Sequence, residues 1–403
     1  MEFFGLRRSI VGLLSMVVLV GMGEHMAEQF LPLYLLSLGG GFISVGFLNG
    51  MDNLLGALYS FPGGYLSDRL GIKRALLVFN LVSMAGFIVV ILVPAWPAVL
   101  AAAALFLSWT AISLPATMSL VARVLPRNKR TMGVSVHSFV RRVPMALGPV
   151  IGGAFVVAWG VEWGVRLAFV GALAMAGLAV VLQQLLIEDE PARDGPAPAA
   201  ERSPLRLWMF MSGDVRNLLV SDILVRFCEQ IPYAFVVVWA VGTDRQPGPV
   251  TAVQFGLLRS IEMATAMLIY VPVAWMADRS RKKPFVVMTF VFFTLFPLAL
   301  YFSRSFWTLA AAFVLRGLKE FGEPTRKALI MDLVPEDRKA AMFGLYYLVR
   351  DVIVSAAAFG GALLWSHSPA LNLGAAFTFG VLGTLWFALR GKDLGPAPTK
   401  PPA

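Results

Sequence analysis

The chain has 403 residues, of which 58% are hydrophobic and only 14% are charged, with a formal net charge of +10. A soluble domain of this length needs far more charge on its surface, so the composition excludes a soluble protein. Most apolar runs exceed the ~20 residues that cross a bilayer as a helix, and none alternates like a barrel strand. The sequence therefore predicts an all-α membrane protein.

Twelve apolar stretches are predicted to be transmembrane helices. The first contains Glu24, His25 and Glu28 and lacks a small-residue cleavage site, so it is interpreted as a retained span rather than a signal peptide. The predicted spans are residues 9–37, 42–64, 73–93, 96–122, 132–159, 164–187, 216–241, 251–277, 284–302, 305–333, 338–366 and 370–390.

Basic residues gather in every second loop between these spans. This pattern follows the positive-inside rule, and it predicts that both termini are cytoplasmic. The same distribution accounts for the positive net charge through the loops on one side of the lipid bilayer, so the charge does not indicate a nucleic-acid partner. The single cysteine, Cys228, lies within an apolar run and excludes an intrachain disulfide.

Three pairs of landmarks recur at a nearly constant offset of about 210 residues, which indicates an internal repeat. They are Asp68 with Asp278, Pro126 with Pro335, and Arg141 with Arg350. We expect an N-terminal six-helix half over residues 1–187 and a C-terminal half over 216–403 that ends in a short disordered tail. Residues 188–215 between them begin with a charged, proline-rich segment and are predicted to form a cytoplasmic linker.

Three motifs resemble the major facilitator superfamily, and in particular its bacterial twelve-span proton-coupled antiporters. They are the loop Gly64–Arg74, the stretch Gly148-Pro149-Val150-Ile151-Gly152-Gly153, and Phe30–Tyr34 at the end of the first span. The resemblance implies two pseudo-symmetric six-helix bundles, a monomer, and a place in the bacterial cytoplasmic (inner) membrane. The drug antiporters of this group carry an arginine in the fourth span, whereas Leu105–Ser119 has none, so the subfamily stays open.

The loop motif and its degraded repeat supply the predicted gating residues. Asp68 and Arg69 end the second span, and Asp278 and Arg279 end the eighth. A carboxylate at such a position can face the positive end of a neighbouring helix, which by resemblance lies in the other half. Such contacts would close the cytoplasmic side during transport. The alternative is that the basic residues only set the topology.

Many ionisable residues lie near the middle of the predicted spans, where an exposed charge costs at least ~2.5–3.5 kcal/mol. In the C-terminal half, helical spacing predicts the pairs Asp222–Arg226, Arg226–Glu229, Arg259–Glu262, Arg316–Glu320 and Lys319–Glu323. Each pair by itself can be purely structural. The whole set favours a functional site, because a structural bundle would use apolar packing instead.

The first span differs, because Glu24 and Glu28 are like charges one helical turn apart with no basic residue in the interior of their own span. Two carboxylates in a confined site favour the binding of a proton, and Arg141 and Arg142 are the expected counter-charges. The residues predicted to couple protons or bind substrate are Glu24, Glu28, Asp52, Arg141, Arg142, Arg226, Glu229, Glu262, Arg316, Glu320 and Arg350.

These features predict a secondary transporter that moves a small polar or charged organic solute by alternating access and is coupled to protons. Three alternatives stay open: a proton-driven multidrug efflux antiporter, a membrane sensor or assembly factor that transports nothing, and a metal-ion exporter. The chain lacks the nucleotide-binding and hydrolase motifs of enzymes and ATP-driven pumps. We therefore predict no enzymatic activity, no cofactor and no resident metal; protons and a small molecule are the expected partners.

Overall fold

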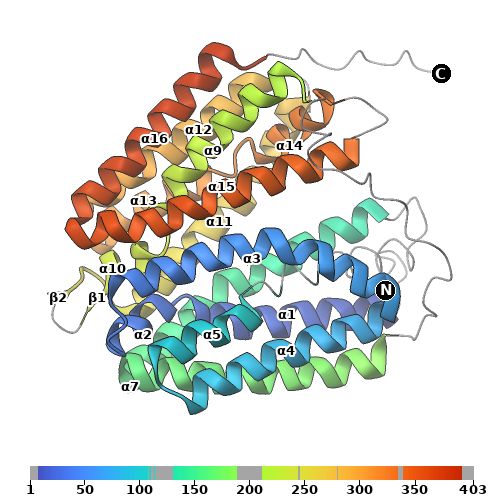
Figure 1. Cartoon of the computed structure of the whole chain (residues 1–403), viewed down its shortest axis with the longest axis vertical. Coiled ribbons are helices and arrows are strands. Elements are labelled where there is room, and N and C mark those ends of the chain that lie inside the picture. The colour runs from blue at the N-terminus through green and yellow to red at the C-terminus, as the bar shows by residue number, and fades with distance from the viewer. Residues whose placement is uncertain are drawn as a thin grey trace. The chain divides into compact units, whose positions relative to one another are not determined.

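The computed structural model describes residues 8–107, 109, 113, 130–187, 211–243, 246–278, 280–334 and 339–392. Almost all of them are helical (Figure 1). The helices are α1 (Arg8–Glu28), α2 (Leu31–Ser37), α3 (Gly41–Leu70), α4 (Ile72–Leu92), α5 (Trp96–Phe106), α7 (Arg130–Leu186), α9 (Gly213–Gln230), α10 (Phe235–Val241), α11 (Ala252–Asp278), α12 (Lys282–Phe302), α13 (Phe306–Leu318), α14 (Glu323–Asp332), α15 (Lys339–His367) and α16 (Pro369–Arg390). Strands β1 (Gly242–Thr243) and β2 (Gln246–Pro247) form a short antiparallel pair.

These helices match the predicted spans, and eight of the described helical stretches are long and apolar enough to cross a membrane. The fourth predicted span begins with α5, and most of its remainder lies outside the described residues. The fifth and sixth spans together form α7, and Gly160 separates them with a φ of +74°. Such a φ is costly for residues other than glycine, so Gly160 permits the sharp turn between the two spans.

Three predicted spans consist of two helices each, and a proline lies in or just after every interruption. The first span breaks at residues 29–30 before Pro32, the seventh at 231–234 around Pro232, and the tenth at 319–322 before Pro324. Proline removes a backbone donor and clashes with the preceding turn, so it favours a break at these places. Glu28, Glu229 and Glu323 lie beside the three interruptions.

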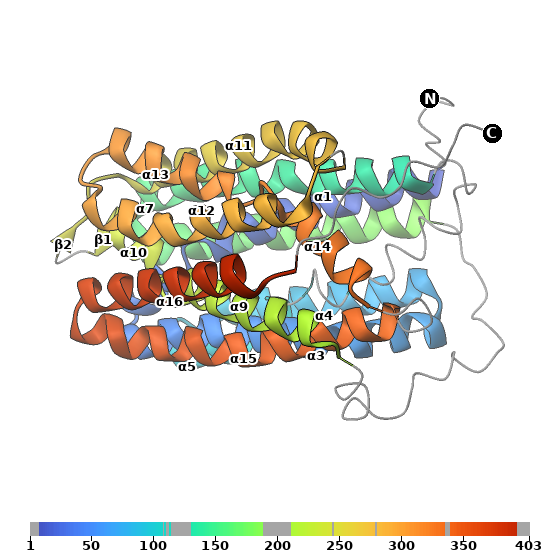
Figure 2. The ribbon, with the colours of Figure 1, turned by 90° about the horizontal axis from the view of Figure 1, so that it is seen from above.

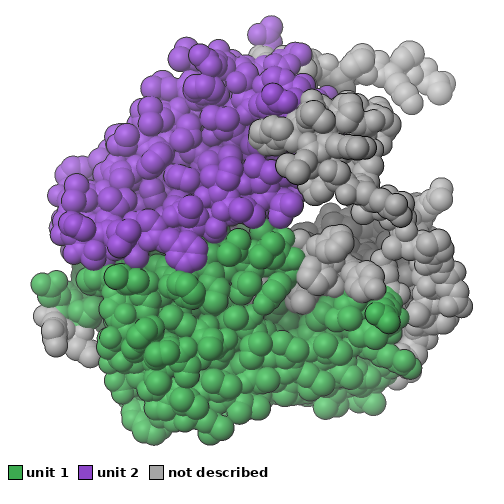
Figure 3. Space-filling model, viewed as in Figure 1, with its two compact units in different colours: residues 1–198, 234–260 green, residues 199–233, 261–403 purple. Residues whose placement is uncertain are grey.

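The chain divides into two compact units (Figure 3). Unit 1 contains residues 1–198 and 234–260, and unit 2 contains residues 199–233 and 261–403. Contacts therefore group α10 and the start of α11 with the N-terminal spans. The predicted division into six-helix halves at 1–187 and 216–403 stays a prediction, and most of the predicted linker lies outside the described residues.

In unit 1 the apolar faces of α1, α4 and α7 form one core, which includes Leu13, Met16, Leu76 and Phe79. A buried polar chain crosses this core. Trp109 donates to the Asn80 side chain at 2.9 Å, and Asn80 donates to Gln183 at 2.7 Å. Gln183 in turn donates to the backbone carbonyl of Lys73 at 2.9 Å. Each buried amide is thereby satisfied, which the low-polarity interior requires.

The predicted glycine-rich stretch in α7 provides close helix packing in unit 1. A Cβ atom added to Gly148 would lie 2.9 Å from the Cβ of His25, and one on Gly152 would overlap the carbonyl of Met26, both on α1. A Cβ on Gly153 would overlap the backbone of Ala252 at the start of α11. Small residues allow transmembrane helices to approach this closely. The stretch therefore fixes the helix that carries Glu24 and Glu28 against α7.

Replacing Gly152 with valine is expected to destabilise the protein by about 1–3 kcal/mol or more, because the new side chain overlaps the α1 backbone, which cannot yield as a side chain can. Thermal unfolding of the purified protein in detergent measures the loss. Gly177→Val, on the same helix, is the matched control, since no atom from elsewhere in the described residues lies within 4 Å of a Cβ at that position. Equal unfolding temperatures for the two variants would contradict the packing role.

In unit 2, α9, α12 and α16 lie side by side (Figures 1 and 2). Their apolar faces form a core with α14 and α15, which includes Leu218, Phe290, Leu329, Tyr346 and Phe387. The glycine Gly317 on α13 packs so closely on α11 that an added Cβ would lie 2.6 Å from the carbonyl of Glu262. This core and the close packing of Gly317 on α11 position the helices that carry the charged side chains of unit 2.

Candidate functional site

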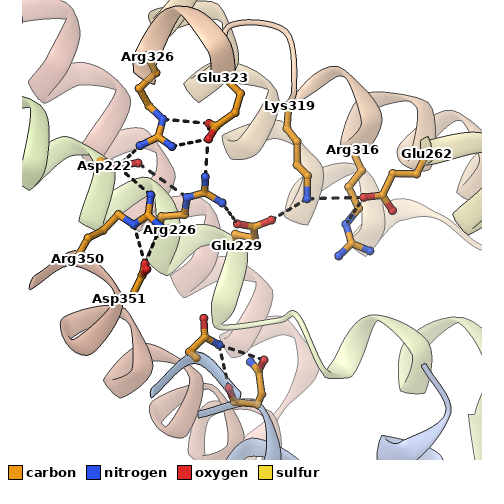
Figure 4. A network of polar contacts seen from close by, with 12 residues as sticks. Asp222, Arg226, Glu229, Glu262, Arg316, Lys319, Glu323, Arg326, Arg350 and Asp351 are labelled. Carbon is orange, nitrogen blue, oxygen red and sulfur yellow. Dashed lines mark hydrogen bonds and ion pairs between the residues drawn. The ribbon is translucent and has the colours of Figure 1, made fainter. Parts of the chain in front are cut away.

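Ten buried or half-buried charged side chains of unit 2 form one continuous network of ion pairs (Figure 4), and the exposed Lys327 contacts its edge at Glu323. They come from α9, α11, α13, α14 and α15 and from the break between α13 and α14. Five are cations and five are carboxylates. They are Asp222, Arg226, Glu229, Glu262, Arg316, Lys319, Glu323, Arg326, Arg350 and Asp351.

Asp222 is the centre of one end of this network. Its side chain is 1% exposed and forms an ion pair with Arg326, whose side chain is equally buried. The guanidinium of Arg350 lies 3.5 Å from the same carboxylate, and the hydroxyl of Tyr346 donates to it at 3.0 Å. A carboxylate this deeply buried needs several donors to offset the loss of water, and these residues supply them.

Arg226 connects Asp222 to the middle of the network. Its guanidinium lies 3.9 Å from Asp222, 2.6 Å from Glu229 and 3.5 Å from Glu323. Arg326 donates to both oxygens of Glu323, at 2.6 and 3.0 Å, in the bidentate geometry that a planar guanidinium favours. Two arginines therefore share Glu323 and Asp222 between them.

Glu229 and Glu262 form the other end. Lys319 lies 2.7 Å from Glu229 and 3.6 Å from Glu262, so it bridges α9 and α11. The Nε atom of Arg316 lies 3.5 Å from Glu262. Lys319 lies in the break between α13 and α14, and its amine lies between these two carboxylates.

These contacts confirm two of the ion pairs expected from helical spacing, Asp222–Arg226 and Arg226–Glu229. Two other expected pairs are wrong. Arg316 lies against Glu262 rather than Glu320, and Lys319 contacts Glu229 and Glu262 rather than Glu323. The cause is the break at 319–322, which ends the helical spacing on which both expectations depended.

Arg326 is the main residue of the network that sequence reasoning missed. Among the described residues it is the largest fully buried side chain, and it lies near the end of the tenth predicted span, outside the mid-membrane charges that the sequence indicates. Its spacing of three residues from Glu323 was the available indication. The hydroxyl of Tyr346 also donates to Asp222, and no spacing in the sequence indicates this contact.

In unit 1 the predicted carboxylates lie together. Glu24 on α1 is buried, and Glu28 one turn later is half-buried directly before the helix break. Glu24 and Asp52, on α3, lie near enough to repel a negative charge on Glu28. The Oε1 atom of Glu28 is fully buried, and no donor reaches it from the part of the chain that the structure describes.

The predicted counter-charges Arg141 and Arg142 are half-buried on α7, which packs along α1 in the same unit. Arg141 and the buried Arg259 act electrostatically on His25, which lies between Glu24 and Glu28 in the sequence. The structure thus brings acidic and basic groups to one stretch of α1. Their roles in coupling or binding stay predictions.

The predicted gating residues are only partly described. Arg69 is exposed at the end of α3, and Gly71 shortly after it has a φ of +82°, as the expected tight turn requires. The side chains of Asp68 and Asp278, and Arg279 altogether, lie outside the described residues. Among the described residues, no group of three or more His, Cys, Asp and Glu side chains could hold a metal ion.

Comparison with known proteins identifies the class of this chain. The family model of the Major Facilitator Superfamily matches residues 13–244 and 223–403, which together span nearly the whole chain. The chain belongs to the Major Facilitator Superfamily, and it is an integral membrane protein. This membership supports a secondary active transporter rather than an enzyme. A search of curated proteins found no significant match.

Solved structures of several transporters share the fold. A crystal structure of the peptide transporter POT in complex with sulfate has a TM-score of 0.77 at 16% identity, covering 96% of this chain and 94% of that one. A POT family transporter in complex with 5-aminolevulinic acid has a TM-score of 0.76 at 14% identity, covering 96% of each chain. A point mutant of the nucleoside transporter NupG has a TM-score of 0.81 at 13% identity, covering 95% of this chain and 100% of that one.

Proposed function

We propose that this protein is a proton-coupled secondary transporter for a small polar or charged organic solute, and that Glu28 is the proton-binding group. The observation that carries the proposal is the buried Oε1 atom of Glu28, which no described donor reaches. A buried carboxylate oxygen without a donor is costly when the group is charged, and binding a proton reduces that cost.

The surroundings of Glu28 add to this argument. Negative charges on Glu24 and Asp52 oppose a third charge beside them. Arg141 and Arg142 on the neighbouring helix α7 are the counter-charges that we expect to favour it in one access state. A carrier needs a group whose proton affinity differs between its two access states. A modest movement of α7 relative to α1 would change this balance of charges, and the break after Glu28 allows the helix end to adjust.

The network of unit 2 supports a polar solute. Its five cations and five carboxylates lie within a membrane protein, next to two interrupted spans. In transporters, interrupted helices and buried charges occur where substrates bind. Such an environment suits a charged or zwitterionic solute better than a lipophilic cation. We propose alternating access as the mechanism, with antiport as the mode of coupling that the sequence motifs favour.

Solute-induced proton flux in proteoliposomes tests this function. The vesicles contain a pH-sensitive dye, and their voltage is clamped with potassium and valinomycin. External probes are dialanine, uridine, 5-aminolevulinic acid and the lipophilic cation tetraphenylphosphonium. We expect a polar probe to move protons; antiport makes the interior more alkaline, and symport makes it more acidic.

Protein-free vesicles are the control for leakage. A proton flux with tetraphenylphosphonium alone would favour multidrug efflux instead. If each polar probe exchanges across the membrane without any proton movement, proton coupling is wrong. If no probe crosses at all, the alternative of a sensor or assembly factor gains support.

A further inference from the structure

Arg316 differs from every other cation of the unit 2 network in how its charge is balanced. Arg226, Lys319, Arg326 and Arg350 each donate to a carboxylate at 2.7 Å or less. Arg316 has only the 3.5 Å approach of its Nε atom to Glu262. Within the described part of the chain, none of its five donors makes a hydrogen bond.

Aromatic rings hold this guanidinium in place. Its Cζ atom lies 5.0 Å from the ring centre of Phe296, 5.4 Å from that of Tyr233 and 5.7 Å from that of Phe313. Stacking on such faces attracts a cation without using its hydrogen-bond donors. The side chain is 5% exposed, so it is nearly removed from water as well.

The two terminal nitrogens of Arg316 point away from the carboxylate of Glu262 and from the other labelled residues (Figure 4). A buried guanidinium with unused donors is costly, and a planar fork of two N–H groups matches a carboxylate in bidentate geometry. Gly317 packs closely on the backbone of α11 at Glu262, and the carboxylate of Glu262 approaches Arg316 at Nε. The fork of terminal nitrogens is therefore the side on which another anion would bind.

We propose that the fork of Arg316 binds the carboxylate of the transported solute, with the rings of Tyr233, Phe296 and Phe313 beside it. This inference rests on the proposed transport function and names its substrate class as small carboxylates. Glu262 then acts as an internal competitor, because its negative charge partly neutralises Arg316 before the solute arrives. Lys319, which lies 3.6 Å from Glu262, can keep that carboxylate paired after binding.

Ligand binding to purified protein at fixed pH tests the site without any gradient. The probes are acetate, benzoate and 5-aminolevulinic acid, each compared with a partner that lacks the carboxylate: acetamide, benzamide and methyl 5-aminolevulinate. Thermal unfolding and calorimetry measure affinity, since a ligand of the native state raises its stability. We expect at least one carboxylate to bind, and the partner without the carboxylate to bind at least about tenfold more weakly, which corresponds to the loss of a charged hydrogen bond.

Three variants identify the residue. Arg316→Lys keeps a charge beside Glu262 but removes the fork, and it should weaken carboxylate binding about tenfold or more. Glu262→Gln removes the competitor and should strengthen it, which a merely structural role would not produce. Arg304→Gln, at an exposed arginine near Tyr301, is the matched control and should leave affinity unchanged.

The proposal is overturned if no carboxylate stabilises the wild-type protein, or if Arg316→Lys binds carboxylates as tightly as the wild type. Inorganic phosphate is included because it presents similar oxygens, and tighter binding of phosphate than of any carboxylate would also overturn the assignment. Carboxylate binding through Arg316 without proton flux in vesicles would leave this site standing and contradict proton coupling alone.

Discussion

Replacing Glu28 with glutamine is expected to abolish transport driven by a pH gradient while solute exchange continues. Glutamine keeps the shape of the side chain but cannot take up or release a proton, so the solute no longer moves against its own gradient. We expect accumulation or extrusion under an imposed pH gradient to fall at least about tenfold, in keeping with the loss of an essential acid–base group. Counterflow, which needs only binding and the two access states, should stay measurable.

The comparison uses vesicles loaded with unlabelled solute for counterflow, and the same vesicles with a pH gradient for driven transport. Glu162→Gln, at an exposed glutamate between the fifth and sixth spans, is the matched control and should retain both activities. The double variant Glu24→Gln/Glu28→Gln covers a proton that moves between the two carboxylates. If this double variant still responds fully to the gradient, the proton site lies elsewhere, and Asp52 and Glu262 become the next candidates.

Much of the fold follows from the sequence because membrane spans are defined by length and apolarity, which are local properties. The predicted boundaries of the third span, 73–93, and the ninth, 284–302, lie within two residues of α4 and α12. Interruptions inside spans were not predicted, although proline marks all three. Pro32, Pro232 and Pro324 lie at breaks, whereas Pro144, Pro149, Pro272 and Pro297 lie within continuous helices. Neighbouring helices decide between these outcomes.

The candidate site could be predicted only in part, because the sequence gives the positions of the charged residues but not which of them form ion pairs. The i,i+3 and i,i+4 pairs on α9 were predictable since both members lie on one unbroken helix. Glu262 pairs with cations from another helix, and its choice of Arg316 and Lys319 depends on close packing at Gly317 and on the break that follows. Long-range packing of this kind leaves no local pattern in the sequence.

The burial of Arg326 and its contact with Asp222 could not be predicted from the sequence either, and both bear on the stability of unit 2. Its spacing from Glu323 suggests an ordinary surface pair, yet it is buried and also contacts Asp222, more than a hundred positions earlier in the chain. The role of Arg326 as a link between α9 and α14 therefore emerges only from the fold. Its removal leaves two carboxylates with fewer donors in the interior of unit 2.

Replacing Arg326 with methionine is accordingly expected to destabilise the protein by about 3–5 kcal/mol, the usual cost of breaking a buried ion pair by removing one partner. Methionine keeps most of the side-chain length, so lost packing contributes little. Asp222 retains Arg350, Arg226 and Tyr346, whereas Glu323 retains Arg226 and Lys327, so the protein should still fold. Unfolding of the detergent-solubilised protein measures the change.

Lys327→Met provides the matched control, because Lys327 is half exposed and lies 3.4 Å from the same Glu323. A pair of this kind contributes about 0–1 kcal/mol, so the control should unfold almost like the wild type. Adding Asp222→Asn to Arg326→Met should recover part of the loss, since it removes the carboxylate that the first change left underpaired. If Arg326→Met costs no more than Lys327→Met, the ion pairs of Arg326 do not stabilise unit 2, and its burial has another cause.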